Sequence, residues 1–263
     1  MKIDRTYPIR YILATVASLG LFFNHNAAAQ TVYSEDFSSP VVEWTDNTIA
    51  SANGEFFLAG SANGSGFGAN ALILNGLPAH SSVTVSFDLY IIQSWDGNGP
   101  EGGGPDNFTV GAGGTILLYT NFANYTGLNT QAYPAELSPF GSGADNPPRT
   151  GQSDSNHLGY GTGDFGDATY SLTCTFAHSG SDFDIFFQSD QNQAVGDEGW
   201  GLDNVVVTVS NSAPPDGRPC IQSSSNPPPS VGGRPIPSLT PVAVIFLVLL
   251  TVAIGARRLL SNR

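Results

Sequence analysis

The sequence predicts an all-β domain over residues 30–210, and three features of this region support that prediction. Apolar and polar side chains alternate in several short runs, which is typical of strands with one buried face. Gly, Asn, Asp and Pro separate these runs and favour turns. No segment repeats its apolar residues with helical spacing. About ten short strands in one region of this size favour two packed sheets, a β-sandwich of the jelly-roll type.

Three runs show the clearest alternation, at residues 83–91, 170–176 and 183–187. In the second run Cys174 is in phase with its apolar neighbours, so it is expected to face the core. In the third run the apolar residues alternate with Asp184, which is expected to face solvent.

Weaker alternation predicts further strands at Val32–Phe37, Glu55–Ala59, Ala71–Leu74, Asn107–Val110, Thr115–Phe122 and Trp200–Ser210. Two long loops remain, at residues 97–105 and 133–167. Loops of the second length in a compact domain are usually functional or disordered. Aromatic residues in this part of the chain could present flat faces to sugar rings; they are Tyr125, Tyr133, Phe140, Tyr160 and Phe165.

The first 29 residues have the three parts of a secretory signal peptide. Lys2, Arg5 and Arg10 precede an apolar run at 11–23, and three alanines follow at 27–29. This order predicts cleavage between Ala29 and Gln30, and therefore export.

The last 28 residues predict a membrane anchor. Residues 241–256 are almost wholly apolar and are followed by Arg257 and Arg258. This predicts a short transmembrane helix with its basic tail in the cytoplasm and the domain outside. Residues 211–235 are rich in Ser, Pro and Gly, which predicts an extended stalk between the domain and the membrane.

The tail also carries a short motif, Ile236, Pro237, Ser238 and Leu239, before the apolar span and the arginine pair. It resembles the C-terminal sorting signals of Gram-negative envelope proteins, in particular the IPTL-CTERM type, which is related to PEP-CTERM. The resemblance implies two partners, the inner membrane and a sorting or processing protease. It also implies transient membrane anchoring before the protein reaches the cell surface or the extracellular matrix.

The domain is strongly acidic. The chain has 22 acidic residues, and only Asp4 and Asp216 lie outside residues 30–213; of its nine basic residues, Arg149 alone lies inside, which leaves a net charge of about −19. This charge excludes nucleic acid as a partner, since nothing neutralises phosphates. Salt bridges cannot satisfy these carboxylates, so solvent cations or a bound metal must do so. Calcium is the expected cofactor for a few of them, because it binds carboxylate and carbonyl oxygens.

Asp203 is the first candidate ligand. It is in phase with Val205, Val207 and Val209 but out of phase with Leu202, which predicts either a bulge near Asp203 or an inward carboxylate. An inward carboxylate is costly without a cation. A carboxylate that simply accepts backbone N–H bonds at the end of the strand is the alternative.

The run GWGLDNVVV, from Gly199 to Val207, resembles the closing strand of galactose-binding-like jelly rolls and carbohydrate-binding modules. The resemblance implies a structural calcium between the first and last strands, bound by Asp203 together with Glu35 and Asp36.

A second group of candidate calcium ligands lies in one Gly-rich loop and comprises Asp96, Glu101 and Asp106. Its sequences SWDG and GPD resemble a strand–loop–strand segment of many exported jelly-roll domains. Glycines there let backbone carbonyls converge on a cation, although a turn with solvated acids explains the same pattern. Asp197 and Glu198 are candidates to join either group.

The domain carries no nucleophile motif of the G-x-S-x-G type and no H-E-x-x-H zinc motif, so we expect no enzyme activity. The expected role is binding or structural, with glycan recognition or adhesion as the specific form. Two alternatives stay open: a polysaccharide hydrolase or lyase using paired carboxylates, and a purely structural matrix protein. Export would permit a disulfide between Cys174 and Cys220, but the position of Cys220 in the predicted stalk argues against one, so the sequence leaves this open.

Overall fold

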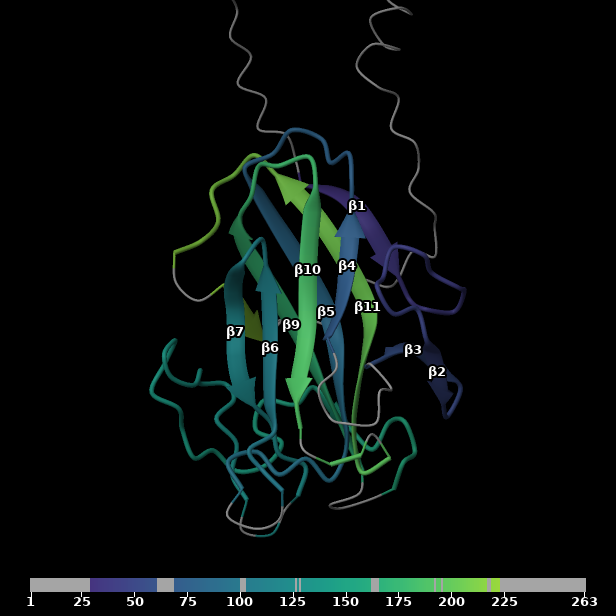
Figure 1. Ribbon diagram of the computed structural model, residues 1–263, viewed down its shortest axis with the longest axis vertical. Helices are drawn as coiled ribbons and strands as arrows, with labels where there is room; N and C mark the ends of the chain where they lie inside the picture. Colours follow the sequence, from purple (N-terminus) through teal and green to yellow (C-terminus); the bar gives the residue numbers. More distant parts are fainter. Residues whose placement is uncertain are drawn as a thin grey trace, which may run out of the picture.

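The computed structural model describes residues 29–60, 69–99, 103–125, 127, 129–161, 166–191, 193–194, 196–216 and 219–222. These residues form strands and no helix (Figure 1). The strands are β1 (Gln30–Glu35), β2 (Ile49–Ala52), β3 (Glu55–Ala59), β4 (Ala69–Leu74), β5 (Ser82–Gln93), β6 (Asn107–Ala112), β7 (Thr115–Asn121), β8 (Asp154–Ser155), β9 (Asp167–Ala177), β10 (Phe183–Asp190), β11 (Glu198–Ser210) and β12 (Cys220–Gln222).

All nine predicted strands are present, with ends shifted by a few residues at most. The short strands β2, β8 and β12 were not predicted. The predicted signal peptide up to residue 28, transmembrane helix and sorting motif lie outside the described residues. Within the described ranges, no helix has the length and hydropathy needed to cross a membrane.

The strands form two antiparallel sheets, which confirms the predicted β-sandwich. The larger sheet has the order β12-β9-β5-β11-β3-β2, with β1 added to β11 and β8 added to β9. The smaller sheet has the order β4-β10-β6-β7. The two long central strands, β5 and β11, pair from Gln93↔Glu198 at one end to Ser82↔Ser210 at the other.

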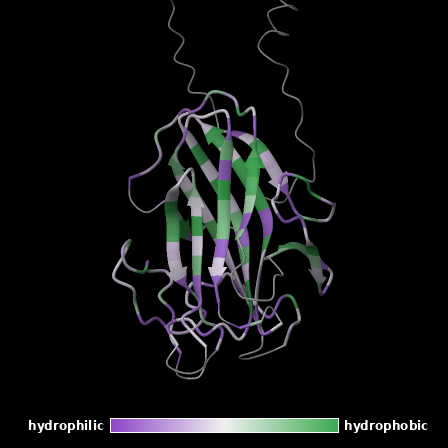
Figure 2. Ribbon diagram, in the orientation of Figure 1, coloured by the Kyte–Doolittle hydropathy of each residue, from purple (hydrophilic) through white to green (hydrophobic). Residues whose placement is uncertain are grey.

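The core lies between the sheets, where alternate residues of facing strands meet. On β5 the inward positions run from Val83 to Ile91 and are at most 1% exposed. Phe87 of the larger sheet packs edge-on against Phe187 of the smaller one, with ring centroids 5.0 Å apart. Figure 2 shows hydrophobic residues on the strands of both sheets, with hydrophilic residues more frequent in the loops at the lower end. Burial of this alternating face is what drives the sheets together.

A β-bulge in β11 explains the phase change predicted around Asp203. The register of β11 on β5 shifts between Asp203 and Val206, and Asn204 adopts a positive φ of 50°. The bulge keeps Leu202 and Val205 both in the core, where each is fully buried. The carboxylate of Asp203 therefore faces away from the main core, toward Tyr90 on the outer side of the larger sheet.

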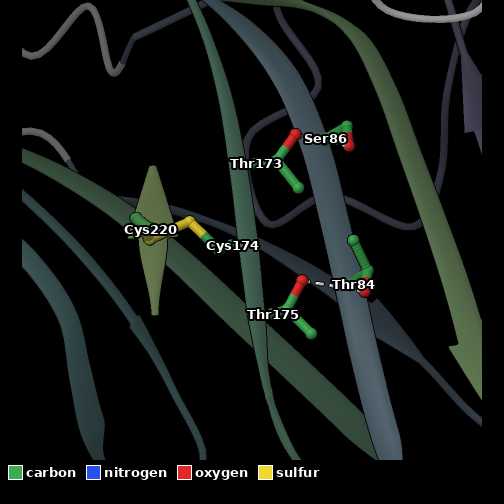
Figure 3. Close-up of a disulfide and its surroundings, with 6 residues drawn as sticks. All are labelled: Thr84, Ser86, Thr173, Cys174, Thr175 and Cys220. Carbon is green, nitrogen blue, oxygen red and sulfur yellow. Dashed lines mark hydrogen bonds between the residues drawn. A yellow bond between two sulfur atoms is a disulfide. The ribbon is translucent and has the colours of Figure 1, made fainter. Parts of the chain in front are cut away.

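A disulfide joins Cys174 of β9 to Cys220 of β12 (Figure 3). Cys174 is fully buried, as its phase predicted. The sequence had left the pairing of these cysteines open. β12, which pairs with β9 as far as Gln222, belongs to the larger sheet and lies within the segment predicted as a stalk.

The opposite face of β9 near the disulfide carries hydroxyl groups. Thr84 and Thr175 lie 3.0 Å apart through their side-chain oxygens, and Ser86 and Thr173 lie 2.9 Å apart (Figure 3). These cross-strand hydrogen bonds hold β5 and β9 together on the outer face of the sheet.

The N-terminal end of the described chain and the long loops lie at opposite ends of the sandwich, whereas β12 lies about midway between them (Figure 1). Gln30 pairs with Val209 near the Ser82 end of β5, and Cys220 pairs with Cys174, whose other neighbour is Val85. The loops that follow β5, β7 and β10 all leave from the Gln93 end. The length of β5 separates these two ends by roughly 35 Å.

Candidate metal centre

Three carboxylates gather in the interior of the loop end. One oxygen from each of Asp96, Asp106 and Glu198 lies within 4.8 Å of the others. Asp106 and Glu198 are fully buried, and Asp96 is 5% exposed. Among the described residues this is the one group of three or more acidic, His or Cys side chains with such geometry.

The sheet termini position these three side chains. Asp96 lies three residues after the end of β5, and Glu198 is the first residue of β11, opposite Gln93 in the ladder. Asp106 directly precedes β6 of the smaller sheet. The group therefore joins both sheets at the point where they end.

Backbone hydrogen bonds hold these segments together around the carboxylates. Ser94 N donates to Asp197 O at 2.9 Å, and the indole Nε1 of Trp95 donates to Gly199 O at 2.8 Å. The backbone N–H of Asp96 donates to the carboxylate of Asp106. Asp96 and Asp106 are thus fixed relative to each other by a direct contact.

Gly97 lets a third segment approach the loop. Its φ is +58°, and a Cβ at this position would overlap the backbone carbonyl of Thr130. The next residue, Asn98, donates its N–H to that same carbonyl at 2.7 Å. A glycine is therefore required for the 129–131 segment to close over the carboxylates.

The hydrogen-bond donors to the carboxylates among the described residues are all neutral. Asp96 accepts from Gly103 N at 3.1 Å, Asn129 Nδ2 at 2.7 Å and Gln193 Nε2 at 3.3 Å. Glu198 accepts from Gln193 N at 3.2 Å. Amide donors reduce the cost of burying negative charge but do not cancel it.

Several oxygens of this region have no hydrogen-bond partner among the described residues. They include Asp106 Oδ1, Glu198 Oε1, Asn129 Oδ1 and Gln191 Oε1. Asn129 and Gln191 are 2% and 3% exposed. Buried polar atoms without a partner are rare in folded proteins, so these four require an explanation.

Negative charge on these three carboxyls is unfavourable, because they are buried and close to one another. Burial raises the pKa of Glu198 above its ordinary value, and the nearby charge of Asp106 raises it further. Burial also raises the pKa of Asp106, with an added contribution from Asp96. Burial and mutual repulsion disfavour the ionised forms of these carboxyls, and a cation bound among them would stabilise the ionised forms.

The structure brings together two residues of the predicted loop group, Asp96 and Asp106. It adds Glu198, which the sequence allowed to join either group. Glu101 lies outside the described residues. Binding of calcium to the group stays a prediction.

The other predicted group, Asp203 with Glu35 and Asp36, does not gather into a three-carboxylate cluster among the described residues. Glu35 accepts the N–H of Phe37 at 3.0 Å, and Asp36 accepts the N–H of Ser38 at 3.0 Å. Asp203 accepts from the hydroxyl of Tyr90 at 2.9 Å.

Asp203 instead lies opposite Asp88 across the β5–β11 ladder. Both are buried, and Asn204 donates one amide to the two carboxylates, at 2.9 Å to Asp88 and 3.4 Å to Asp203. Ser171 Oγ donates to the second oxygen of Asp88 at 2.6 Å. Hydrogen bonds thus occupy both oxygens of each carboxylate in this second acidic pair.

Two residues of the metal centre, Asn129 and Gln191, were not anticipated from the sequence. Asn and Gln are abundant throughout the domain, and nothing in the local pattern distinguishes these two. Only the fold shows that Asn129 contacts the carboxylate of Asp96 and that Gln191 contacts the backbone of Glu198.

Comparison with models of known protein families finds no family that matches this chain, and comparison with curated proteins finds no matching relative. The interpretation of the site therefore depends on its own geometry.

The Asp88–Asp203 pair predicts a pH dependence of stability. Burial, with the charge of Asp88 as a smaller cause, raises the pKa of Asp203 from 3.8 to about 7. The unfolded chain releases this proton near pH 3.8 and the folded chain near 7, so stability falls as the pH rises between these values. In the wild type, this group is expected to lower the free energy of unfolding by on the order of 2–4 kcal/mol over this pH range. The Asp203→Asn variant is expected to lack this decrease.

Urea unfolding of both proteins across this pH range checks the expectation. Asp184→Asn, on an exposed position of β10, controls for the loss of one carboxyl group. If the free energy of unfolding depended on pH equally in the wild type and in Asp203→Asn, the raised pKa could not belong to Asp203.

Proposed function

We propose that this chain is an exported binding or structural domain, held at the cell envelope by its C-terminal segment and presented at the cell surface or in the extracellular matrix. Glycan recognition or adhesion is its specific role, and calcium is its cofactor. We propose that the sandwich is of the jelly-roll type. The inner membrane and a sorting protease are its partners during export.

The Cys174–Cys220 disulfide is the observation that carries this proposal. Disulfides persist in oxidising compartments outside the cytoplasm, which agrees with the signal peptide expected at 1–29. The bond also attaches β12, which lies within the expected stalk, to its neighbour β9 in the larger sheet. Force applied through the C-terminal segment would reach β9 through a covalent link.

The long loops support a binding role. They lie at the Gln93 end of β5, whereas Gln30 lies near the Ser82 end and β12 pairs midway along β9. Two of the loop aromatics singled out in the sequence, Phe140 and Tyr160, are 49% and 37% exposed, whereas Tyr133 is buried. Exposed aromatic rings are the surfaces on which sugar rings pack.

The hydrolase alternative receives less support. It predicts two carboxylates that face each other at an accessible position, with a cleft between them. Asp88 and Asp203 face each other but are 7% and 4% exposed and engaged in hydrogen bonds. This arrangement favours a role of the pair in holding β5 and β11 together.

Export can be tested with the full chain expressed in a Gram-negative host. Protease added to spheroplasts is expected to degrade the domain, and maleimide is expected to label its cysteines only after reduction. Cytoplasmic protein with two thiols that react without reduction would contradict the proposal. A cytoplasmic protein of the same host serves as the control for lysis.

Glycan binding can be tested by retention of the purified full chain on insoluble polysaccharides. We expect retention without release of reducing ends, and a roughly twofold to tenfold weaker retention for Phe140→Ala or Tyr160→Ala. Val42→Ala, at an exposed apolar position away from the long loops, is the matched control. Release of reducing ends that is lost in Asp88→Asn would favour the hydrolase instead.

A further inference from the structure

No positively charged side chain contacts Asp96, Asp106 or Glu198 within the described part of the chain. Arg149 is the one Lys or Arg in residues 30–213, and its Nε donates to Asn124 Oδ1 at 3.2 Å. The donors from described residues that reach the three carboxylates are neutral N–H groups. Burying uncompensated carboxylates is among the most costly arrangements in a fold, so something else must stabilise this one.

A second observation is independent of the acidic residues. The amide of Asn129 donates through Nδ2 to Asp96, and its Oδ1 has no partner among the described residues. The amide of Gln191 donates through Nε2 to the backbone oxygen of Glu198, and within the same part of the chain its Oε1 has no partner either. One almost fully buried amide thus contacts a carboxylate of the group and another contacts its backbone, and each carries an oxygen for which the described residues supply no donor.

We infer that one calcium ion binds among these residues, coordinated by the carboxylates of Asp96, Asp106 and Glu198 and by the amide oxygens of Asn129 and Gln191. The carboxylate oxygens lie within 4.8 Å of one another. Calcium binds oxygen at 2.3–2.6 Å, so a single ion between them reaches all three. One cation then accounts for both the uncompensated charge and the unpartnered oxygens.

The donor set selects calcium over other common cations. Zinc in proteins prefers His and Cys ligands, and the group contains neither. Magnesium dehydrates reluctantly and keeps several water ligands, whereas the carboxylates here are at most 5% exposed. Calcium accepts six to eight oxygen ligands in a flexible arrangement, which suits carboxylates and amides from five segments.

The burial of the ligands assigns the ion a structural role. It would join the end of β5, the start of β6, the start of β11 and the 129–131 segment, and it would be enclosed by them. An enclosed ion cannot coordinate a glycan directly. It fixes the loops on which a ligand surface would be built, and this role holds wherever the protein acts.

The test is a thermal melt of the full chain in mild detergent, first in EDTA and then in millimolar calcium, with magnesium in parallel. At free calcium about 100 times Kd, the melting temperature is expected to rise by roughly 5–11 °C. Glu198→Gln and Asp106→Asn should abolish the rise. Asp203→Asn, which removes another buried carboxylate of β11, should retain it.

Three results would overturn the inference. The first is a melt unaffected by calcium in the wild type. The second is an equal rise with magnesium, and the third is a rise that is lost in Asp203→Asn but kept in Glu198→Gln. If the Glu198 and Asp106 variants fail to fold, elemental analysis of the wild type decides. One calcium per chain after gel filtration supports the site, and none overturns it.

Discussion

The arrangement of the loop end depends on one electrostatic constraint: negative charge is buried where the two sheets end, in a domain that has almost no positive charge. Asp96, Asp106 and Glu198 occupy positions at which β5, β6 and β11 terminate. Glu198 is part of β11, and Asp96 and Asp106 are held together because the N–H of Asp96 donates to the carboxylate of Asp106. A bound cation would satisfy this constraint, and the neighbouring loops would then have a fixed surface against which to pack.

The sandwich separates this loop end from the end at which β1 begins. The long central pair β5–β11 carries the core between the sheets and spans the distance between the two ends. The bulge at Asp203 and Asn204 keeps both halves of β11 in phase with that core. The Cys174–Cys220 disulfide links β12 covalently to its neighbour β9 in the larger sheet.

Local patterns predicted most of the fold because burial on one face of a strand leaves a period of two in the sequence. All nine strands with such a period are present, and the phase of Cys174 and of Asp184 was predicted correctly. The short strands β2, β8 and β12 have too few residues to show a period. The pairing of Cys174 with Cys220 depends on how the chain returns to the sheet after β11, which no local pattern records.

The candidate site was predicted only in part, for a related reason. Asp96 and Asp106 share one loop, and their proximity follows from the chain itself. Glu198 is about a hundred residues away and reaches them only because β11 pairs with β5. Asp203 is in phase with Val205 but out of phase with Leu202, which predicted either a bulge or an inward carboxylate. The structure has the bulge, and the side chain of Asp203 is directed toward Asp88 and Tyr90. A phase anomaly in a strand therefore indicates a bulge as readily as a ligand.

The most direct test of the central claim is terbium luminescence of the full chain, excited through tryptophan. Terbium replaces calcium at oxygen sites, and Trp95 is adjacent in sequence to Asp96 and fully buried. The account predicts sensitised emission that saturates at one ion per chain, is displaced by calcium, and is lost in Glu198→Gln but not in Asp203→Asn. Emission that is absent, or that survives Glu198→Gln unchanged, would contradict it.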